Sequence, residues 1–218
     1  MTFNRQKRLL RAAQLAMVFL TAGSAQAAVI RFDADPFGGT TVLQTPGRQV
    51  VGGELFIPAF DLGTDVIAFD AAAFKVDPVV RFVNDFAIGL PAGGVNAIVL
   101  RDDDFDGVAS NGRALNAVQS ADLIAGRITE EGAGFFVYFN TALDLNRLVY
   151  STDLSSSSAD LKIVARFLDQ AGQDGIDVLP QWSASNFTAV PEPATASLVL
   201  AGLAGLACRR RRAANAAL

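Results

Sequence analysis

The segment RDDDFDG contains the most distinctive set of potential ligands in the chain. Asp102, Asp104 and Asp106 alternate along it, and Gly107 follows. Carboxylate oxygens at every second position before a glycine turn are the ligands that a calcium loop uses. The twelfth position, where an EF-hand has a Glu, is Arg113, which argues against that class of loop. Two interpretations remain open: a looser loop that binds Ca²⁺, which is then the only cofactor indicated, or an acidic surface turn.

Composition removes several classes of enzyme. The chain contains no histidine, and its one cysteine is Cys208. Ser-His-Asp and Cys-His catalysis, a disulfide within the chain and a cysteine-rich zinc site are therefore excluded. Asp is abundant enough that a pair of nearby carboxylates could arise by chance, so such a pair is no evidence for glycoside hydrolysis. We assign no catalytic residue and expect a protein that is not an enzyme.

The aromatic residues and the charges indicate which kinds of ligand the protein is suited to bind. Most of the 16 Phe lie in strand-like runs, where packing in the core is the default. Trp182, in LPQWSAS, is the best candidate for an exposed residue that stacks on a sugar. All acidic side chains except Glu192 lie between residues 28 and 189, whereas both ends of the chain are basic. An acidic body argues against nucleic acid as a partner.

The first 27 residues have the three parts of a secretory signal peptide. A basic start is followed by an apolar run and then by small residues. The apolar run, about ten residues long, is too short to span a membrane stably. Ala25 and Ala27 form an A-x-A pattern, so we expect a signal helix that is cleaved between Ala27 and Ala28. The Sec translocon and signal peptidase are the partners that this prediction implies.

The other end of the chain combines three features. The first is a segment that must be extended, because proline fixes φ and lacks an N–H: Val190, Pro191, Glu192 and Pro193. The second is the uncharged segment 194–208, which we expect to form a transmembrane helix. The third is a cluster of arginines, which the positive-inside tendency holds in the cytoplasm with residues 213–218. Its members are Arg209, Arg210, Arg211 and Arg212.

These three features, in this order, resemble a PEP-CTERM sorting signal, over residues 189–212. Proteins with such tails occur in Gram-negative bacteria that make exopolysaccharide. The resemblance implies that an exosortase, a transpeptidase-like membrane enzyme, recognises Pro191, Glu192 and Pro193 and removes the tail. It also implies that the arginines are a retention signal, and that the protein is held briefly in the inner membrane before it reaches the cell surface or the extracellular matrix.

Residues 28–188 are expected to form one exported domain. Short runs rich in Val, Ile and Phe, separated by Gly, Pro and Asp, are typical of strands. They are AVIRFDA, GTTVLQT, ELFIPAF, DVIAFD, VVRFVNDF, VNAIVLR, GFFVYFN, NRLVYST and LKIVARFL. The last three predict an antiparallel meander, in which Lys162 and Arg166 mark a partly solvated face. DQAGQDGID predicts a hairpin turn.

One short helix is expected, from about Ala114 or Ala121 to Thr129, with Ser120 as a candidate N-cap. The fold class that we predict is therefore mainly β: an antiparallel β-sandwich-like domain with one short helix, plus the signal helix and the C-terminal transmembrane helix.

The second half of the body also resembles a type of domain that recurs among PEP-CTERM proteins. The segments that carry the resemblance are GAGFFVYFNTALDLNRLVYSTDL and ADLKIVARF. It implies a compact, mostly β domain and supplies no activity. We therefore expect an exported surface or matrix protein with a non-enzymatic interaction or structural domain. The alternative is an exported protein that binds or hydrolyses carbohydrate, with exopolysaccharide as its partner.

Overall fold

The computed structural model describes residues 27–102 and 115–190 of the chain. The strands are β1 (Val29–Phe32), β2 (Val50–Val51), β3 (Leu55–Ile57), β4 (Val66–Asp70), β5 (Phe82–Asp85), β6 (Ala97–Leu100), β7 (Gly134–Asn140), β8 (Leu145–Ser151), β9 (Leu161–Ala171) and β10 (Phe187–Val190). The helices are α1 (Ala117–Ala125) and α2 (Gly172–Val178), and the 3-10 helices are η1 (Val42–Gln44), η2 (Ala87–Gly89), η3 (Leu179–Gln181) and η4 (Ala184–Asn186). The prediction of a mainly β protein is confirmed.

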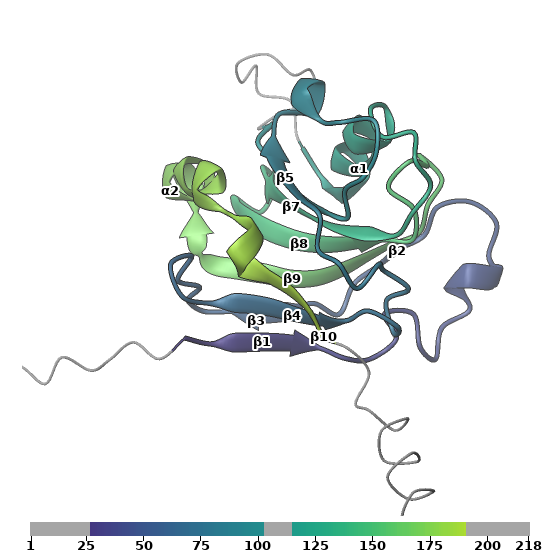
Figure 1. The fold of residues 1–218 in the computed structure, drawn as a ribbon, viewed down its shortest axis with the longest axis horizontal. Helices are drawn as coiled ribbons and strands as arrows, with labels where there is room; N and C mark the ends of the chain where they lie inside the picture. Colours follow the sequence, from purple (N-terminus) through teal and green to yellow (C-terminus); the bar gives the residue numbers. More distant parts are fainter. Residues whose placement is uncertain (1–26, 103–114, 191–218) are drawn as a thin grey trace, which may run out of the picture.

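The strands form two sheets (Figure 1). The large sheet has the order β2-β9-β8-β7-β6-β5, and β3 also pairs with β9, beyond β2. Its antiparallel pairs, β7–β8 and β8–β9, are the predicted meander. The pairs β5–β6, β6–β7, β2–β9 and β3–β9 are parallel. The expectation of an antiparallel arrangement therefore holds only for the meander.

The small sheet consists of β1, β4 and β10, and all three strands are parallel. Val29 pairs with Val66, and Phe187 pairs with Ile67, so the three strands begin at the same end of the sheet. These strands come from the start, the first third and the end of the described chain. Because each connection between them passes through the large sheet, the two sheets cannot fold as separate domains.

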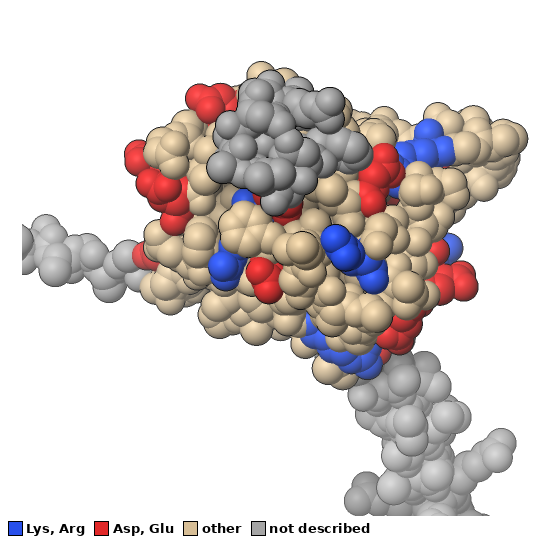
Figure 2. All heavy atoms as spheres, turned by 90° about the horizontal axis from the view of Figure 1, so that it is seen from above, with Lys and Arg blue, Asp and Glu red and all other residues tan. Residues whose placement is uncertain are grey.

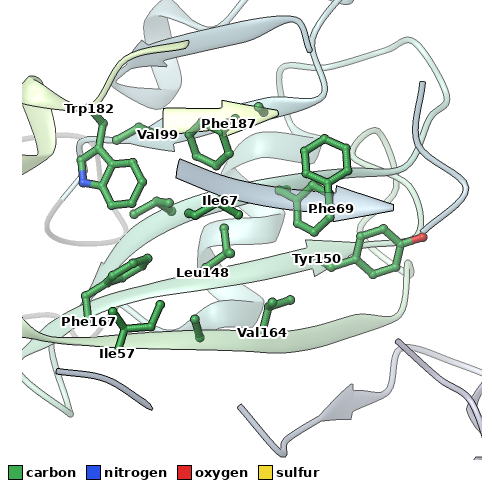
Figure 3. Packing of buried hydrophobic residues seen from close by; sticks show 14 of the residues in the cluster. Ile57, Ile67, Phe69, Val99, Leu148, Tyr150, Val164, Phe167, Trp182 and Phe187 are labelled. Carbon is green, nitrogen blue, oxygen red and sulfur yellow. The ribbon is translucent and has the colours of Figure 1, made fainter. Parts of the chain in front are cut away.

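The large sheet is covered on both faces (Figure 1), and Figure 3 shows part of the cluster on the face toward the small sheet. One hydrophobic cluster lies between the two sheets and includes Phe69 of β4 and Phe135 of β7, whose ring centroids are 4.6 Å apart. A second cluster lies on the opposite face, where Phe136 of β7 packs with Ile124 of α1. Residues of β7 alternate between the two clusters, and the whole strand is buried. This burial explains why GFFVYFN is a continuous apolar run rather than an alternating one.

Helix α1 begins with a capping box that the sequence interpretation missed. The side chain of Asn116 accepts hydrogen bonds from the backbone N–H groups of Val118 and Gln119, at 2.9 and 3.1 Å, and Gln119 accepts one from the N–H of Asn116. Ser120 is buried inside the helix instead of capping it. The helix ends at Ala125, with Gly126 as C-cap, so it is shorter than the expected segment to Thr129.

Two other segments differ from the prediction. GTTVLQT does not form a strand: Val42–Gln44 is the 3-10 helix η1. DQAGQDGID is not a hairpin turn, because β9 continues to Ala171 and Gly172–Val178 forms α2. Position 175 of α2 has no room for a side chain, because a Cβ atom there would lie 2.5 Å from the carbonyl oxygen of Gln170. A glycine that local patterns assign to a turn is here needed for close packing of a helix on a strand.

A β-bulge in β9 separates two basic residues that were expected on one face. Neighbouring residues of β8 pair with Ile163 and Ala165, so Val164 is an extra residue on β9. Lys162 therefore lies on the face toward the small sheet, whereas Arg166 lies on the face toward α1. Within residues 27–102 and 115–190, no helix is long and apolar enough to cross a membrane. The predicted signal helix and transmembrane helix lie outside these ranges.

Candidate functional site

The segment that leads to the predicted sorting signal is the last strand of the small sheet. β10 pairs with β4, and Val190 lies opposite Asp70. Phe187 is buried and contacts the ring of Trp182, with ring centroids 5.7 Å apart. Residues 186–189 are thus part of the fold of the domain. The strand extends two residues beyond position 188, where the predicted domain ended.

Trp182 is buried, not exposed, so the prediction of a sugar-stacking residue was wrong. Only 2% of its surface is accessible. Its ring stacks on Phe60, with centroids 5.0 Å apart. It also meets Phe167 edge-on at 5.2 Å, and Figure 3 labels both Trp182 and Phe167. Trp182 thereby connects η3 and β10 to the large sheet. It holds the final strand in place and cannot contact a ligand from the surface.

Three residues that directly precede the strands of the small sheet form a cluster of hydrogen bonds, here called the strand-start cluster. They are Ala28, Asp65 and Asn186. The backbone N–H of Ala28 donates to Oδ1 of Asp65 at 2.7 Å. The side-chain amide of Asn186 donates to the backbone carbonyls of Leu62 and Asp65, at 2.9 and 3.2 Å. The cluster thus ties the beginnings of β1, β4 and β10 together.

The electrostatics of Asp65 follow from these donors. The hydrogen bond from Ala28 is the main cause of a lowered pKa for the Asp65 carboxyl; burial opposes it, and a further hydrogen bond from the backbone of Asp61 adds to it. Ala27 and Ala28, which flank the predicted cleavage point, are both exposed. The third residue of the predicted cleavage pattern, Ala25, lies outside the described residues.

The predicted calcium loop is described only at its first ligand. Asp102 is 1% exposed, and its Oδ2 accepts a hydrogen bond from the backbone N–H of Ala87 at 2.7 Å. Asp104 and Asp106 lie outside the described residues. In the ranges that the structure describes, no group of three His, Cys, Asp or Glu side chains could hold a metal ion. Calcium binding by the full loop stays a prediction.

An ionic cluster that the sequence interpretation missed lies on the α1 face of the large sheet. Arg147 of β8 and Arg166 of β9 are directly opposite each other, and both contact Oε1 of Glu54. Glu54 precedes β3 and is separated from the arginines by more than 90 positions, so no local pattern could have indicated the contact. The guanidinium of Arg166 also lies over the exposed ring of Phe56, 5.2 Å from its centroid.

This cluster lines an open cleft of about 400 Å³ between β2, β9 and the start of α1. Burial would raise the pKa of Glu54, but a hydrogen bond from its own backbone N–H and the two arginines hold it below its usual value of 4.5. Glu54 is therefore ionised at neutral pH, and the cluster carries one net positive charge. Its chemistry suits the binding of an anion more than proton transfer.

Charges of both signs are mixed on the face that Figure 2 shows, with no broad basic area among the described residues. A nucleic-acid interface requires a basic patch or stripe. The described residues on the face in Figure 2 do not form such a patch.

The described chain is thus a mainly β body whose last strand ends at the residue before a proline-flanked segment. Residues 189–212 match the family model of the PEP-CTERM protein-sorting motif. The chain therefore carries a PEP-CTERM sorting motif, which indicates export with processing by an exosortase. The match begins inside β10, at Ala189, and leaves the body unassigned.

No curated protein and no solved structure matches the chain. Of the sorting residues, Val190 is the last of β10; Pro191, Glu192, Pro193 and Arg209 to Arg212 lie outside the described residues.

Proposed function

We propose that the protein is an exported interaction or structural domain that is delivered to the cell surface or the extracellular matrix through its C-terminal signal. In this proposal residues 1–27 are a signal peptide and residues 28–188 the exported domain. Residues 189–212 are the sorting signal, with a transient transmembrane helix, and residues 213–218 remain in the cytoplasm. The observation that carries the proposal is the match to the sorting motif at residues 189–212.

The junction between body and motif supports this order of events. β10 runs into the motif without a linker, so the recognition residues follow a strand that belongs to the folded body. A folded body on one side and an apolar segment on the other confine Pro191, Glu192 and Pro193 to a short stretch of chain near the membrane. That is where a membrane enzyme can reach them.

Three carboxylates of the described residues are not suited to act as a general acid. Glu54, Asp65 and Asp77 all have lowered pKa values. A general acid needs a raised pKa, as the acid of a glycoside hydrolase does. The perturbed groups instead bind arginines or backbone N–H groups, which are structural roles.

The test is expression of the full chain in a Gram-negative host, with and without its exosortase, followed by fractionation and mass spectrometry of both termini. We expect released protein that begins at Ala28 and lacks Arg209 to Arg212, and retention in the membrane when the exosortase is absent. Glu192→Ala should also cause retention, whereas Glu131→Ala, at an exposed position of the body, should not. Released protein that still carries the four arginines would refute the processing step.

A second candidate is binding of an acidic polysaccharide at the cleft beside Glu54. The observation that favours it is the exposed ring of Phe56 next to Arg166, because a guanidinium binds a carboxylate and an aromatic ring stacks on a sugar ring. Binding to a polyuronate should be weakened by Phe56→Ala and by Arg166→Gln. Leu168→Ala, a change at another exposed position of β9, is the matched control. Equal binding by all three variants would refute this candidate.

A further inference from the structure

Asp65 is a buried carboxylate whose hydrogen bonds come from neutral donors. Oδ1 accepts from the N–H of Ala28 at 2.7 Å and from the hydroxyl of Thr64 at 3.3 Å, and Oδ2 accepts from the N–H of Asp61 at 2.9 Å. Among the described residues, ion pairs involve four arginines and none of them reaches Asp65. A carboxylate at the start of the small sheet thus accepts two N–H groups and a hydroxyl, and has no cationic partner among the described residues.

One of these donors is the nitrogen that signal cleavage would release. Hydrolysis of the Ala27–Ala28 peptide bond adds the hydroxyl of water to the carbonyl carbon of Ala27 and a proton to the nitrogen of Ala28. The new α-amine takes up a further proton from solvent below its pKa, which is about 7.7 to 8.0 in unfolded chains. A neutral amide that faces Asp65 then becomes an ammonium group.

We propose that Asp65 is the binding site for the α-ammonium group that removal of residues 1–27 creates at Ala28. The resulting ion pair fastens the start of β1 to the start of β4. This inference rests on the proposed function, since that proposal supplies the cleavage between Ala27 and Ala28.

The new terminus needs no rearrangement to reach its site. The carbonyl of Ala28 accepts a hydrogen bond from the N–H of Val66 at 2.9 Å, and Val29 pairs with Val66 in the sheet. These contacts do not involve residues before Ala28, so they persist after cleavage. They hold the nitrogen opposite Asp65 and reduce the entropy that the ion pair costs.

Two neighbouring carboxylates also favour the α-ammonium group, without taking the place of Asp65 as its partner. The carboxylate of Asp61 accepts the N–H of Gly63 at 2.8 Å, and that of Asp169 accepts the N–H of Phe60 at 2.8 Å. Both add negative potential near the start of the sheet. Ala28 is exposed, so water screens the pair, and we expect its α-amino pKa to rise by only about half to one unit.

The sign of the pH dependence follows from that rise. The pKa of the α-amino group is higher in the folded than in the unfolded protein, so its stabilisation is complete below the unfolded value of about 7.8. It is lost as the pH rises through the folded value. The lowered pKa of Asp65 adds an acid limit, because the pair is lost when that carboxyl is protonated.

The experiment compares four forms of the chain from Ala28 to Leu218, kept in detergent micelles because residues 194–208 are apolar. The forms carry either a free or an acetylated Ala28 nitrogen, each with Asp65 or with Asp65→Asn. Acetylation keeps an N–H donor and removes the charge, so it reproduces the uncleaved amide. The α-amino pKa is measured from the pH dependence of its reaction with acetic anhydride, read by mass spectrometry of the N-terminal peptide.

We expect a pKa about half to one unit above that of the same chain in urea, and no such rise in Asp65→Asn. The free amine should raise the unfolding temperature by about 1 to 4 °C over the acetylated form at pH 6.5, and by nothing at pH 10. This thermal comparison uses the unaltered Asp65, so it decides the matter even where Asp65→Asn does not fold. An unshifted pKa, or equal unfolding temperatures at pH 6.5, overturns the inference.

A separate measurement tests the cleavage that the proposed function supplies. Mass spectrometry of the exported protein reads its first residue directly. A terminus other than Ala28 overturns the predicted cleavage and, with it, the ion pair in the cell. A terminus at Ala28 with an unperturbed α-amine overturns only the role of Asp65.

Discussion

Glu54→Gln removes the charge that bridges two arginines and keeps the size of the side chain. In the folded protein Arg147 contacts Oε1 of Glu54 at 3.0 Å, and Arg166 contacts the same oxygen. The two arginines face each other across β8 and β9. Without the carboxylate, two guanidinium groups that are directly opposite in a sheet repel each other, and both lose a charged hydrogen-bond acceptor.

The exposed fractions of the three side chains determine how much stability Glu54→Gln should cost. Loss of one partner of a fully buried ion pair costs about 3 to 5 kcal/mol, whereas an exposed pair contributes about 1 kcal/mol or less. The side chains of Glu54 and Arg147 are 8% and 12% exposed, and that of Arg166 is 27% exposed. The cluster lies between the two limits and nearer to the buried one. We expect Glu54→Gln to lower the free energy of unfolding by about 2 to 3 kcal/mol at neutral pH.

The pH dependence separates this charge effect from a change in packing. Burial alone would raise the pKa of Glu54, but its backbone hydrogen bond and the two arginines lower it overall. The contribution of Glu54 is therefore present above its usual pKa of 4.5 and is lost as the pH falls through the lower folded value. The difference between the wild type and Glu54→Gln should shrink in acid.

The assay is urea denaturation at neutral and acidic pH, followed by the fluorescence of Trp182. This is the only tryptophan of the chain, and its stacking on Phe60 makes it sensitive to loss of the fold. Glu131→Gln, at an exposed position, is the matched control and should change little. A loss of stability equal to that of the control, or one of the same size at all pH values, would refute the reasoning.

Three further predictions concern single positions. Gly134→Ala should destabilise the protein by about 1 to 3 kcal/mol in thermal unfolding, because the new Cβ would lie 2.7 Å from the carbonyl oxygen of Asn96. Gly132→Ala is the control and should be nearly neutral, because its Cβ would have nothing within 4 Å. Equal effects of the two changes would contradict this prediction. Asn186→Ala should cost about 2 to 3 kcal/mol, because it leaves the half-buried carbonyl of Leu62 and the buried carbonyl of Asp65 without their amide donor. An unchanged urea midpoint would show that water replaces the amide. The near-ultraviolet absorbance at pH 10 to 11 should show less tyrosinate in the folded than in the unfolded protein. Burial raises the pKa of Tyr138 and, with the charge of Asp35, raises that of Tyr150 to about 12. A titration that matches the unfolded protein would contradict this burial.

Local patterns predicted the elements whose neighbours in space are also neighbours in the sequence. The meander β7–β8–β9 was found because each strand is long, apolar and separated from the next by a short polar turn. The capping box at Asn116 was within reach of the sequence, since Asn followed three residues later by Gln is a known N-terminal pattern. It was missed because Ser120 is a common N-cap residue as well.

Contacts between distant parts of the chain could not be predicted. Glu54 meets Arg147 and Arg166 only because β3 adds to the edge of β9, and nothing in the sequence near Glu54 indicates this pairing. The parallel pairs of the small sheet likewise join strands that are far apart in the chain. The bulge at Val164 depends on how β9 pairs with β8, because the apolar run from Ile163 to Ala165 does not itself show which residue is the extra one.

The placement of β10 has a mechanical consequence. A protein held at its C-terminus while its body is pulled away from the membrane transmits the force through Val190 into this strand. A pull along the strand axis loads all the hydrogen bonds between β10 and β4 in shear, so they must break together rather than one by one. Phe187, packed on Trp182 at the start of the strand, resists the same displacement. The small sheet therefore resists a force that is applied to the body through Val190.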